Sequence, residues 1–207
     1  DLRRLEPKLQ LLELYLKGYA MTKRIILAVS GSISAYKAAD LTSRLKKKGY
    51  DVHVIMTEAA QAFITPLTLQ VLSKNPVHTD VMEEKLAERI NHIDLAKETD
   101  LFIVAPASAN TIAKLAHGMA DNMLTATALA LPSTTPKLIA PAMNTKMYEN
   151  PLTKKNLKTL QEVGYQEILP KSGLLACGDT GRGALADIAV IIESIDSALT
   201  RKGVYDE

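Results

Sequence analysis

The segment PAMNTKMYENP, residues 141–151, places an asparagine between methionines directly after an apolar run. Pro141 turns the chain, and Asn144 then stands between Met143 and Met147. A carboxamide among thioethers is neither a metal-ligand set nor a nucleophile paired with its base. The segment therefore indicates a polar group held at the end of a buried strand. Its spacing leaves open what that group recognises.

A serine-rich segment, SGSISAYK, has the composition of an anion-binding loop. Gly31 permits a tight turn, and the hydroxyl groups of Ser30, Ser32 and Ser34 gather where a helix is predicted to begin. The segment lacks the G-x-G-x-x-G of a dinucleotide loop and the Lys-Ser/Thr pair of a P-loop. A single phosphate fits it better, which indicates a mononucleotide such as FMN. An ordinary serine-rich helix cap would have the same composition.

A second polar segment, APASANT, ends another apolar run. Ser108, Asn110 and Thr111 either bond a ligand or cap the helix that is predicted to follow. Capping is the commoner role for such residues taken alone. Grouped with the other strand ends, they favour a ligand.

Two residues of reactive type remain. His92, in RINHID, titrates near physiological pH and is a candidate general base. Cys177, the only cysteine, lies in GLLACGDTGRGALAD, where three glycines indicate a flexible flap. A thiol on a mobile loop is a candidate proton donor or nucleophile. The plainer alternatives are a structural histidine and an inert, buried thiol.

A scaffold must position these segments, and the apolar runs predict one. Strands that are apolar throughout, with amphipathic helices between them, are typical of a parallel sheet covered on both faces. The sequence therefore predicts a single-domain α/β fold, Rossmann-like (flavodoxin-like), with ligands beyond the carboxyl ends of the strands. Residues 1–20 are expected to be an upstream extension, because Met21 opens a run that leads directly into a strand, and residues 21–207 are expected to form the domain. The predicted strands cover 24–30, 51–57, 101–107, 137–144 and 165–170.

Composition narrows the class of protein. The 207 residues are 47% hydrophobic with a net charge of +2, which suits a folded domain and gives no sign of a nucleic-acid partner. No apolar run is long enough to cross a bilayer and no secretory segment opens the chain, so no membrane partner and a cytoplasmic location are expected. One cysteine cannot form an intramolecular disulfide or a multi-cysteine zinc site, and no metal site is predicted.

Together the motifs resemble those of the homo-oligomeric flavin-containing cysteine decarboxylase family. The family pattern P-x-M-N-x-x-M-W is similar to residues 141–148, and the pattern L-A-C-G-D matches residues 175–179. SGSISAYK, NHI and APASANT occur in the family's order, so the likeness runs from about residue 22 to the last predicted helix. Within the family, the likeness is strongest to the branch that decarboxylates phosphopantothenoylcysteine to phosphopantetheine in coenzyme A biosynthesis.

The resemblance implies a mechanism and a role for each matched residue. The family oxidises a cysteine thiol with FMN, releases carbon dioxide and then returns the hydride, so the net reaction is that of a carboxy-lyase. His92 is implied to assist the oxidation and decarboxylation half, Cys177 to donate the final proton, and Asn144 to bind the substrate carboxylate. The other implied substrate-binding residues are Ala142, Met143, Met147, Leu175 and Ala176. The implied FMN-binding residues are Gly31, Ser32, Ile33, Thr57, Phe63, Ser108, Ala109, Asn110 and Thr111.

One position departs from the family pattern, because Tyr148 stands where the family has tryptophan. Tyrosine keeps an aromatic wall but is smaller, and its hydroxyl group needs a hydrogen-bond partner. The change bears on the shape of the pocket more than on the reaction class.

Several alternatives remain open. A peptidyl-cysteine oxidative decarboxylase of lantibiotic biosynthesis would stop at the enethiol and would not need Cys177. A regulatory FMN-binding module would be expected to carry an acidic tail, whereas this sequence ends in YDE. A flavin prenyltransferase would not carry both motifs, and an electron-transfer flavodoxin fits poorly with a net charge of +2. The family also implies a homotrimer or an assembly of trimers, in which neighbouring chains complete each site.

Overall fold

The structure, a computed structural model, describes residues 22–83, 91–174, 178 and 180–205. The extension predicted over residues 1–20 lies outside the described residues, as do Leu175, Ala176 and Cys177. Across the described ranges, every helix is too short or too polar to pass through a lipid bilayer.

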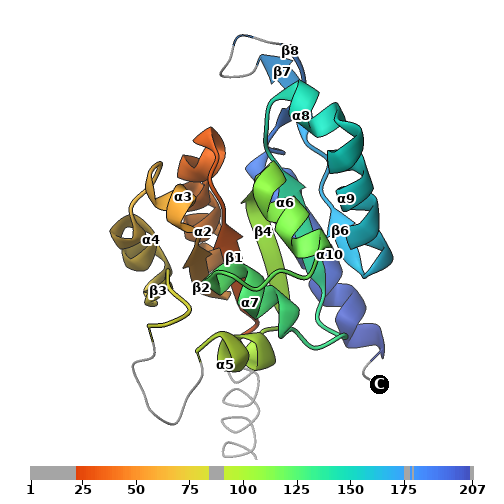
Figure 1. Cartoon of the computed structure of the whole chain (residues 1–207). Helices are drawn as coiled ribbons and strands as arrows, with labels where there is room; N and C mark the ends of the chain where they lie inside the picture. Colours follow the sequence, from red (N-terminus) through yellow and green to blue (C-terminus); the bar gives the residue numbers. More distant parts are fainter. Residues whose placement is uncertain (1–21, 84–90, 175–177, 179, 206–207) are drawn as a thin grey trace, which may run out of the picture.

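Six parallel strands form the central sheet, in the order β3-β2-β1-β4-β5-β6 (Figure 1). Five of them confirm the predicted strands. The edge strand β3 is an addition, because two residues are too few to show a periodicity. Without β3 the strand order is that of a flavodoxin-like sheet, which confirms the predicted fold class. The strands are β1 (Arg24–Val29), β2 (Asp51–Met56), β3 (Val77–His78), β4 (Leu101–Ala107), β5 (Lys137–Pro141) and β6 (Tyr165–Glu167).

Helices cover both faces of the sheet, because successive strand residues point to opposite faces and both faces are apolar. In β1, Ile25 and Leu27 belong to one buried cluster, whereas Ile26 and Ala28 belong to the other. The first cluster packs against η2 (Ile33–Tyr36), α2 (Lys37–Lys47), α3 (Glu58–Gln61), α4 (Pro66–Ser73) and α10 (Ile188–Tyr205). The second packs against α5 (Asn91–Glu98), α6 (Ala109–Ala116), α7 (Met123–Leu129), α8 (Thr145–Glu149) and α9 (Pro151–Glu162).

The glycine-rich segment differs from its prediction. In place of a flap without regular structure, β7 (Lys171–Leu174) and β8 (Thr180–Ala184) pair antiparallel as a hairpin. The hairpin stands at the carboxyl edge of the sheet, next to α8, at the top of Figure 1. Gly181 and Gly183 therefore lie in a strand that packs closely against residues 143–145, and the predicted flap around Cys177 lies outside the described residues.

Asp51, at the start of β2, is held by hydrogen bonds at the opposite, amino-terminal edge of the sheet. Burial alone would raise the pKa of this carboxyl group. Hydrogen bonds from Asn75 Nδ2 (2.9 Å), His53 Nε2 (3.0 Å) and Arg24 Nε (3.0 Å) outweigh burial and lower the pKa to about 2. A carboxyl whose pKa is lowered by folding stabilises the folded protein above its unfolded pKa, and this contribution is lost as the pH falls through the folded pKa.

We therefore expect Asp51→Asn to lower the free energy of unfolding by about 2 kcal/mol near neutral pH. The difference from the wild type should shrink between about pH 4 and pH 2, where the wild-type carboxyl takes up its proton. Urea unfolding at a series of pH values measures this, with the exposed Asp40→Asn as the matched control. A constant difference across that range would contradict the prediction.

Candidate functional site

Two adjoining cavities lie at the carboxyl ends of β1, β4 and β5. The larger, about 480 Å³, lies between the loop after β1 and the segment after β5. The second, about 430 Å³, extends from the same loop toward the end of β2 and the start of α6. Both are lined by Gly31, Ser108, Ala109 and Met147. They meet between β1 and β4, where the strand order reverses, which is where open parallel sheets bind ligands.

Ser30 joins the loop after β1 to the end of β4. Its hydroxyl donates to the carbonyl oxygen of Pro106 (2.7 Å) and accepts from the backbone N–H of Ser108 (2.8 Å). The residue is fully buried. The prediction that this hydroxyl takes part in holding an anion is therefore wrong: Ser30 fixes the two strand ends to each other.

Gly31 brings the same loop against α3. A Cβ atom at this position would lie 2.6 Å from Cβ of Ala59, so no larger residue fits without moving the loop. The close approach positions Ser32 and Ser34, whose Oγ atoms are 3.2 Å apart and which both line the larger cavity. Two hydroxyl groups and a tight turn thus meet at one end of that cavity.

The hydroxyl groups of Thr57 and Ser108 cap helices as well as lining the second cavity. Thr57 Oγ1 accepts from the backbone N–H of Ala60 (3.2 Å), at the start of α3. Ser108 Oγ accepts from the backbone N–H of Thr111 (3.2 Å) and donates to Thr111 Oγ1 (3.3 Å). Capping and cavity lining, which the sequence offered as alternatives, occur together at these strand ends.

Asn144 begins α8, and its Oδ1 accepts from the backbone N–H of Lys146 (2.8 Å). It lines the larger cavity together with Met143 and Met147. The hairpin supports this segment, because the Met143 N–H donates to the carbonyl oxygen of Gly183 (2.9 Å). A Cβ atom at Gly183 would overlap the carbonyl oxygen of Met143. The clamp segment of residues 142–147 is therefore backed by β8.

Tyr148 points away from the cavities and into the core. Only 3% of it is exposed, and it packs in the cluster between the sheet and α9. Its hydroxyl donates to Glu167 Oε1 (2.8 Å), and Lys154 Nζ lies 3.4 Å from the centre of its ring. Burial and the Glu167 carboxylate raise the pKa of Tyr148. The expected aromatic wall of the pocket is therefore wrong, and the hydroxyl has found its partner on β6.

The predicted site residues other than His92 divide into four groups. Those that line the larger cavity are Gly31, Ser32, Ile33, Ser108, Ala109, Ala142, Met143, Asn144 and Met147. Thr57, Asn110 and Thr111 line the second cavity. Phe63 lines neither and is 47% exposed on the loop between α3 and α4. Leu175, Ala176 and Cys177 lie outside the described residues.

His92 is not brought to these cavities. It lies in the first turn of α5, at the end of the sheet opposite the β7–β8 hairpin (Figure 1). Its ring Nδ1 is buried, and within the described residues it has no hydrogen-bond partner. Within one copy of the chain, His92 therefore faces a different region from Asn144.

Five residues of the larger cavity escaped the sequence-based prediction: Tyr36, Lys37, Gly183, Ala184 and Leu185. Among the described residues that line this cavity, Lys37 alone carries a charge. The signal was present in SGSISAYK, where a lysine follows the serines. Gly183 and Leu185 carried no comparable signal, because the pairing of β7 with β8 is what brings them to the cavity.

A parallel α/β sheet with a cavity at its switch point, lined by hydroxyl-bearing and small residues, defines a Rossmann-like protein that binds a nucleotide-like ligand. A family model described as Flavoprotein matches residues 16–200, and the chain belongs to this family. The cofactor is accordingly a flavin.

Two curated relatives show how far the similarity extends. The chain is 64% identical over 179 residues to the probable phosphopantothenoylcysteine decarboxylase of Streptococcus mutans serotype c, which covers 86% of this chain and 100% of the relative. It is 50% identical over 171 residues to the coenzyme A biosynthesis bifunctional protein CoaBC of Bacillus subtilis (strain 168). That second match covers 83% of this chain but 42% of the bifunctional protein.

Solved structures show the same fold. A cysteine-to-serine variant of a PPC decarboxylase, complexed with pantothenoylaminoethenethiol, superposes with a TM-score of 0.76 at 34% identity, covering 84% of this chain and 97% of that one. The FMN-dependent cysteine decarboxylase SpaF superposes with a TM-score of 0.76 at 31% identity, covering 87% of this chain and 97% of that one.

Proposed function

We propose that this chain catalyses the FMN-dependent decarboxylation of phosphopantothenoylcysteine to phosphopantetheine, a carboxy-lyase reaction of coenzyme A biosynthesis. The observation that carries the proposal is the larger cavity, in which Asn144 and its two methionines share a space with Ser32 and Ser108. Similarity along the whole length of a probable phosphopantothenoylcysteine decarboxylase supports the substrate.

The donor groups and the space available fit FMN. The two adjoining cavities, about 480 and 430 Å³, have room for a mononucleotide and a substrate side by side. Ser32, Ser34 and Lys37 offer two hydroxyl groups and one ammonium group around the same cavity, which suits a single phosphate. The FMN dependence of SpaF supports the same choice.

The residues of the clamp segment would hold the carboxylate that is lost. A bound flavin would supply a two-electron sink for the substrate thiol. Asn144 would donate a hydrogen bond from its side-chain amide to the substrate carboxylate. The amide donates a hydrogen bond but carries no positive charge, so it stabilises the carboxylate of the bound substrate less than an arginine would. The loss of carbon dioxide is therefore opposed less by an asparagine than by an arginine. Met143 and Met147 would keep water away from that carboxylate.

The two reactive side chains would act at different stages. In the proposed mechanism Cys177 donates the proton that completes the saturated thiol product. His92 lies at the opposite end of the sheet from Asn144, so its implied role requires a second copy of the chain. In the proposed homotrimer, or assembly of trimers, His92 of one copy serves the cavity of its neighbour. The trimer and a cytoplasmic location both stay predictions.

A visible absorption spectrum followed by mass spectrometry tests the proposed function. We expect the purified protein to show the bands of oxidised flavin, and to convert phosphopantothenoylcysteine to a product lighter by carbon dioxide alone. Heat-denatured protein supplemented with FMN is the control. A protein that stays colourless and inert after FMN is added would refute the proposal.

The same measurement separates a second candidate, oxidative decarboxylation that stops at the enethiol. SpaF is an FMN-dependent cysteine decarboxylase, and FMN-dependent decarboxylation of a cysteine is the step that both candidates share. Its product would be lighter by carbon dioxide and two further hydrogens. A flavin spectrum without any decarboxylation would instead support a regulatory FMN-binding module.

A further inference from the structure

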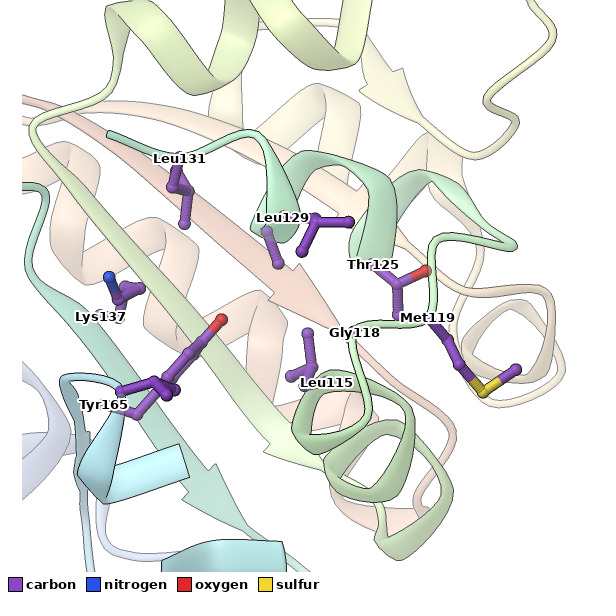
Figure 2. A pocket seen from close by; sticks show the side chains of 10 residues that line it. Leu115, Gly118, Met119, Thr125, Leu129, Leu131, Lys137 and Tyr165 are labelled. Atoms are coloured by element: carbon purple, nitrogen blue, oxygen red, sulfur yellow. The ribbon is translucent and has the colours of Figure 1, made fainter. Parts of the chain in front are cut away.

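A third cavity lies away from the carboxyl edge, between α6, α7 and the first residues of β5 and β6 (Figure 2). Its volume is about 200 Å³, and it shares no lining residue with the two cavities described above. Leu115, Leu129 and Leu131 make much of its wall. A cavity of about 200 Å³ is small for a ligand pocket, but an apolar cavity of about 150 Å³ already holds a molecule the size of benzene.

Two polar side chains enter this cavity from neighbouring strands. Lys137 and Tyr165 are register partners at the first positions of β5 and β6. Lys137 Nζ lies 5.8 Å from the centre of the Tyr165 ring. Figure 2 shows the Tyr165 hydroxyl directed toward the middle of the cavity, whereas the Lys137 nitrogen is directed away from that hydroxyl. The cavity is thus lined by a phenolic hydroxyl and by an ammonium group carried on a flexible four-carbon side chain.

The charge on Lys137 is not compensated. Within the described part of the chain, no carboxylate forms an ion pair with it, and its ammonium group contacts the face of the Tyr165 ring. Burial lowers the pKa of Lys137, with no opposing contribution from a neighbouring anion. A partly buried ammonium group among leucines is unfavourable unless an anion accompanies it.

We propose that this cavity binds a small organic anion, with its carboxylate on the Lys137 ammonium group and the Tyr165 hydroxyl and its aliphatic body against the three leucines. A single lysine suits a monovalent carboxylate better than a phosphate, which favours several donors. The volume limits the body to a short or branched chain. Leu115 lies in the last turn of α6, whose first residues line the second cavity, so the occupant would touch the helix that also borders the flavin site.

Isothermal titration of the flavin-loaded protein with 4-methylpentanoate tests the site, with 4-methylpentanamide as the uncharged control. We expect one binding site per chain with a Kd on the order of 1 mM or tighter, and at least about tenfold weaker binding of the amide. Lys137→Met should weaken binding of the carboxylate by at least about tenfold, and Tyr165→Phe by a smaller factor. Lys155→Met, on the exposed face of α9, should leave binding unchanged.

Three results would overturn the proposal. The first is the absence of binding at concentrations well above 1 mM. The second is equal affinity for the carboxylate and the amide, or full affinity in a Lys137→Met protein whose thermal unfolding shows that it is folded. The third is binding that appears only after the protein is diluted to a monomer. That result would mean that a second copy of the chain covers the cavity in the assembled protein.

Discussion

Replacing Gly183 by alanine is expected to reduce kcat/KM for decarboxylation by roughly 100-fold and to lower the free energy of unfolding by about 1–3 kcal/mol. The added Cβ would overlap the carbonyl oxygen of Met143, a backbone atom that cannot rotate away. Relief requires β8 and the clamp segment to separate, and this would stretch the bond from Met143 N–H to Gly183 O. Because Asn144 is the next residue along the clamp, its amide would shift relative to the substrate. Steady-state kinetics together with urea unfolding measure both effects.

Gly173→Ala is the matched control in the same hairpin. Gly173 pairs with Gly181 across the two strands, and nothing lies within 4 Å of a Cβ atom built at position 173. Its activity should stay close to that of the wild type. Equal losses in the two variants would show that the hairpin is sensitive to any added side chain, and the specific role of Gly183 would then be lost.

The second large effect is expected from Asn144→Asp, which should lower kcat/KM by roughly 100-fold or more. An aspartate keeps the oxygen that accepts from the Lys146 N–H, so the start of α8 is preserved. The change replaces an amide donor by a negative charge that repels the substrate carboxylate. The loss should therefore appear in kinetics with little change in the free energy of unfolding.

Asn150→Asp is the control that shows whether the loss of activity depends on where the negative charge is placed. Asn150 caps α9 in the same way, with Oδ1 accepting from the Leu152 N–H at 2.9 Å, and it is exposed. This variant should keep near wild-type activity. Full activity of Asn144→Asp would remove Asn144 from substrate binding, whereas strong losses in both variants would indicate a general effect of negative charge on this side of the molecule.

The fold was predictable from the sequence for those elements that have a clear hydrophobic pattern over a few neighbouring residues. Four of the predicted strands (β1, β2, β4 and β5) are largely apolar segments of five to seven residues, and their alternation with amphipathic helices is compatible with few topologies. The hairpin was not predictable in this way, since β7 and β8 are short, polar and glycine-rich and show no apolar periodicity. The edge strand β3 is too short to leave a pattern.

The candidate site follows the same division. Ser32, Ser108 and Asn144 were found because the carboxyl ends of parallel strands meet at one edge, and all three line the larger cavity. Ser30 stands in the same motif but turns inward to Pro106, a difference that only the packing of β1 against β4 determines. Phe63 and His92 were implied by the family resemblance, and neither lines the two cavities within one chain.

The contact between β8 and the clamp segment bears on how this chemistry can be transplanted. A Cβ atom at Gly181 would lie 2.5 Å from Oγ1 of Thr145, so a second glycine of β8 is also fitted to the clamp. A protein engineer who grafts residues 141–148 onto another scaffold would carry over the recognition groups without the surface that shapes them. The smallest unit that can be transferred is the clamp segment together with β8. In a mutational library that varies one of them and keeps the other fixed, most variants will contain steric clashes between the two.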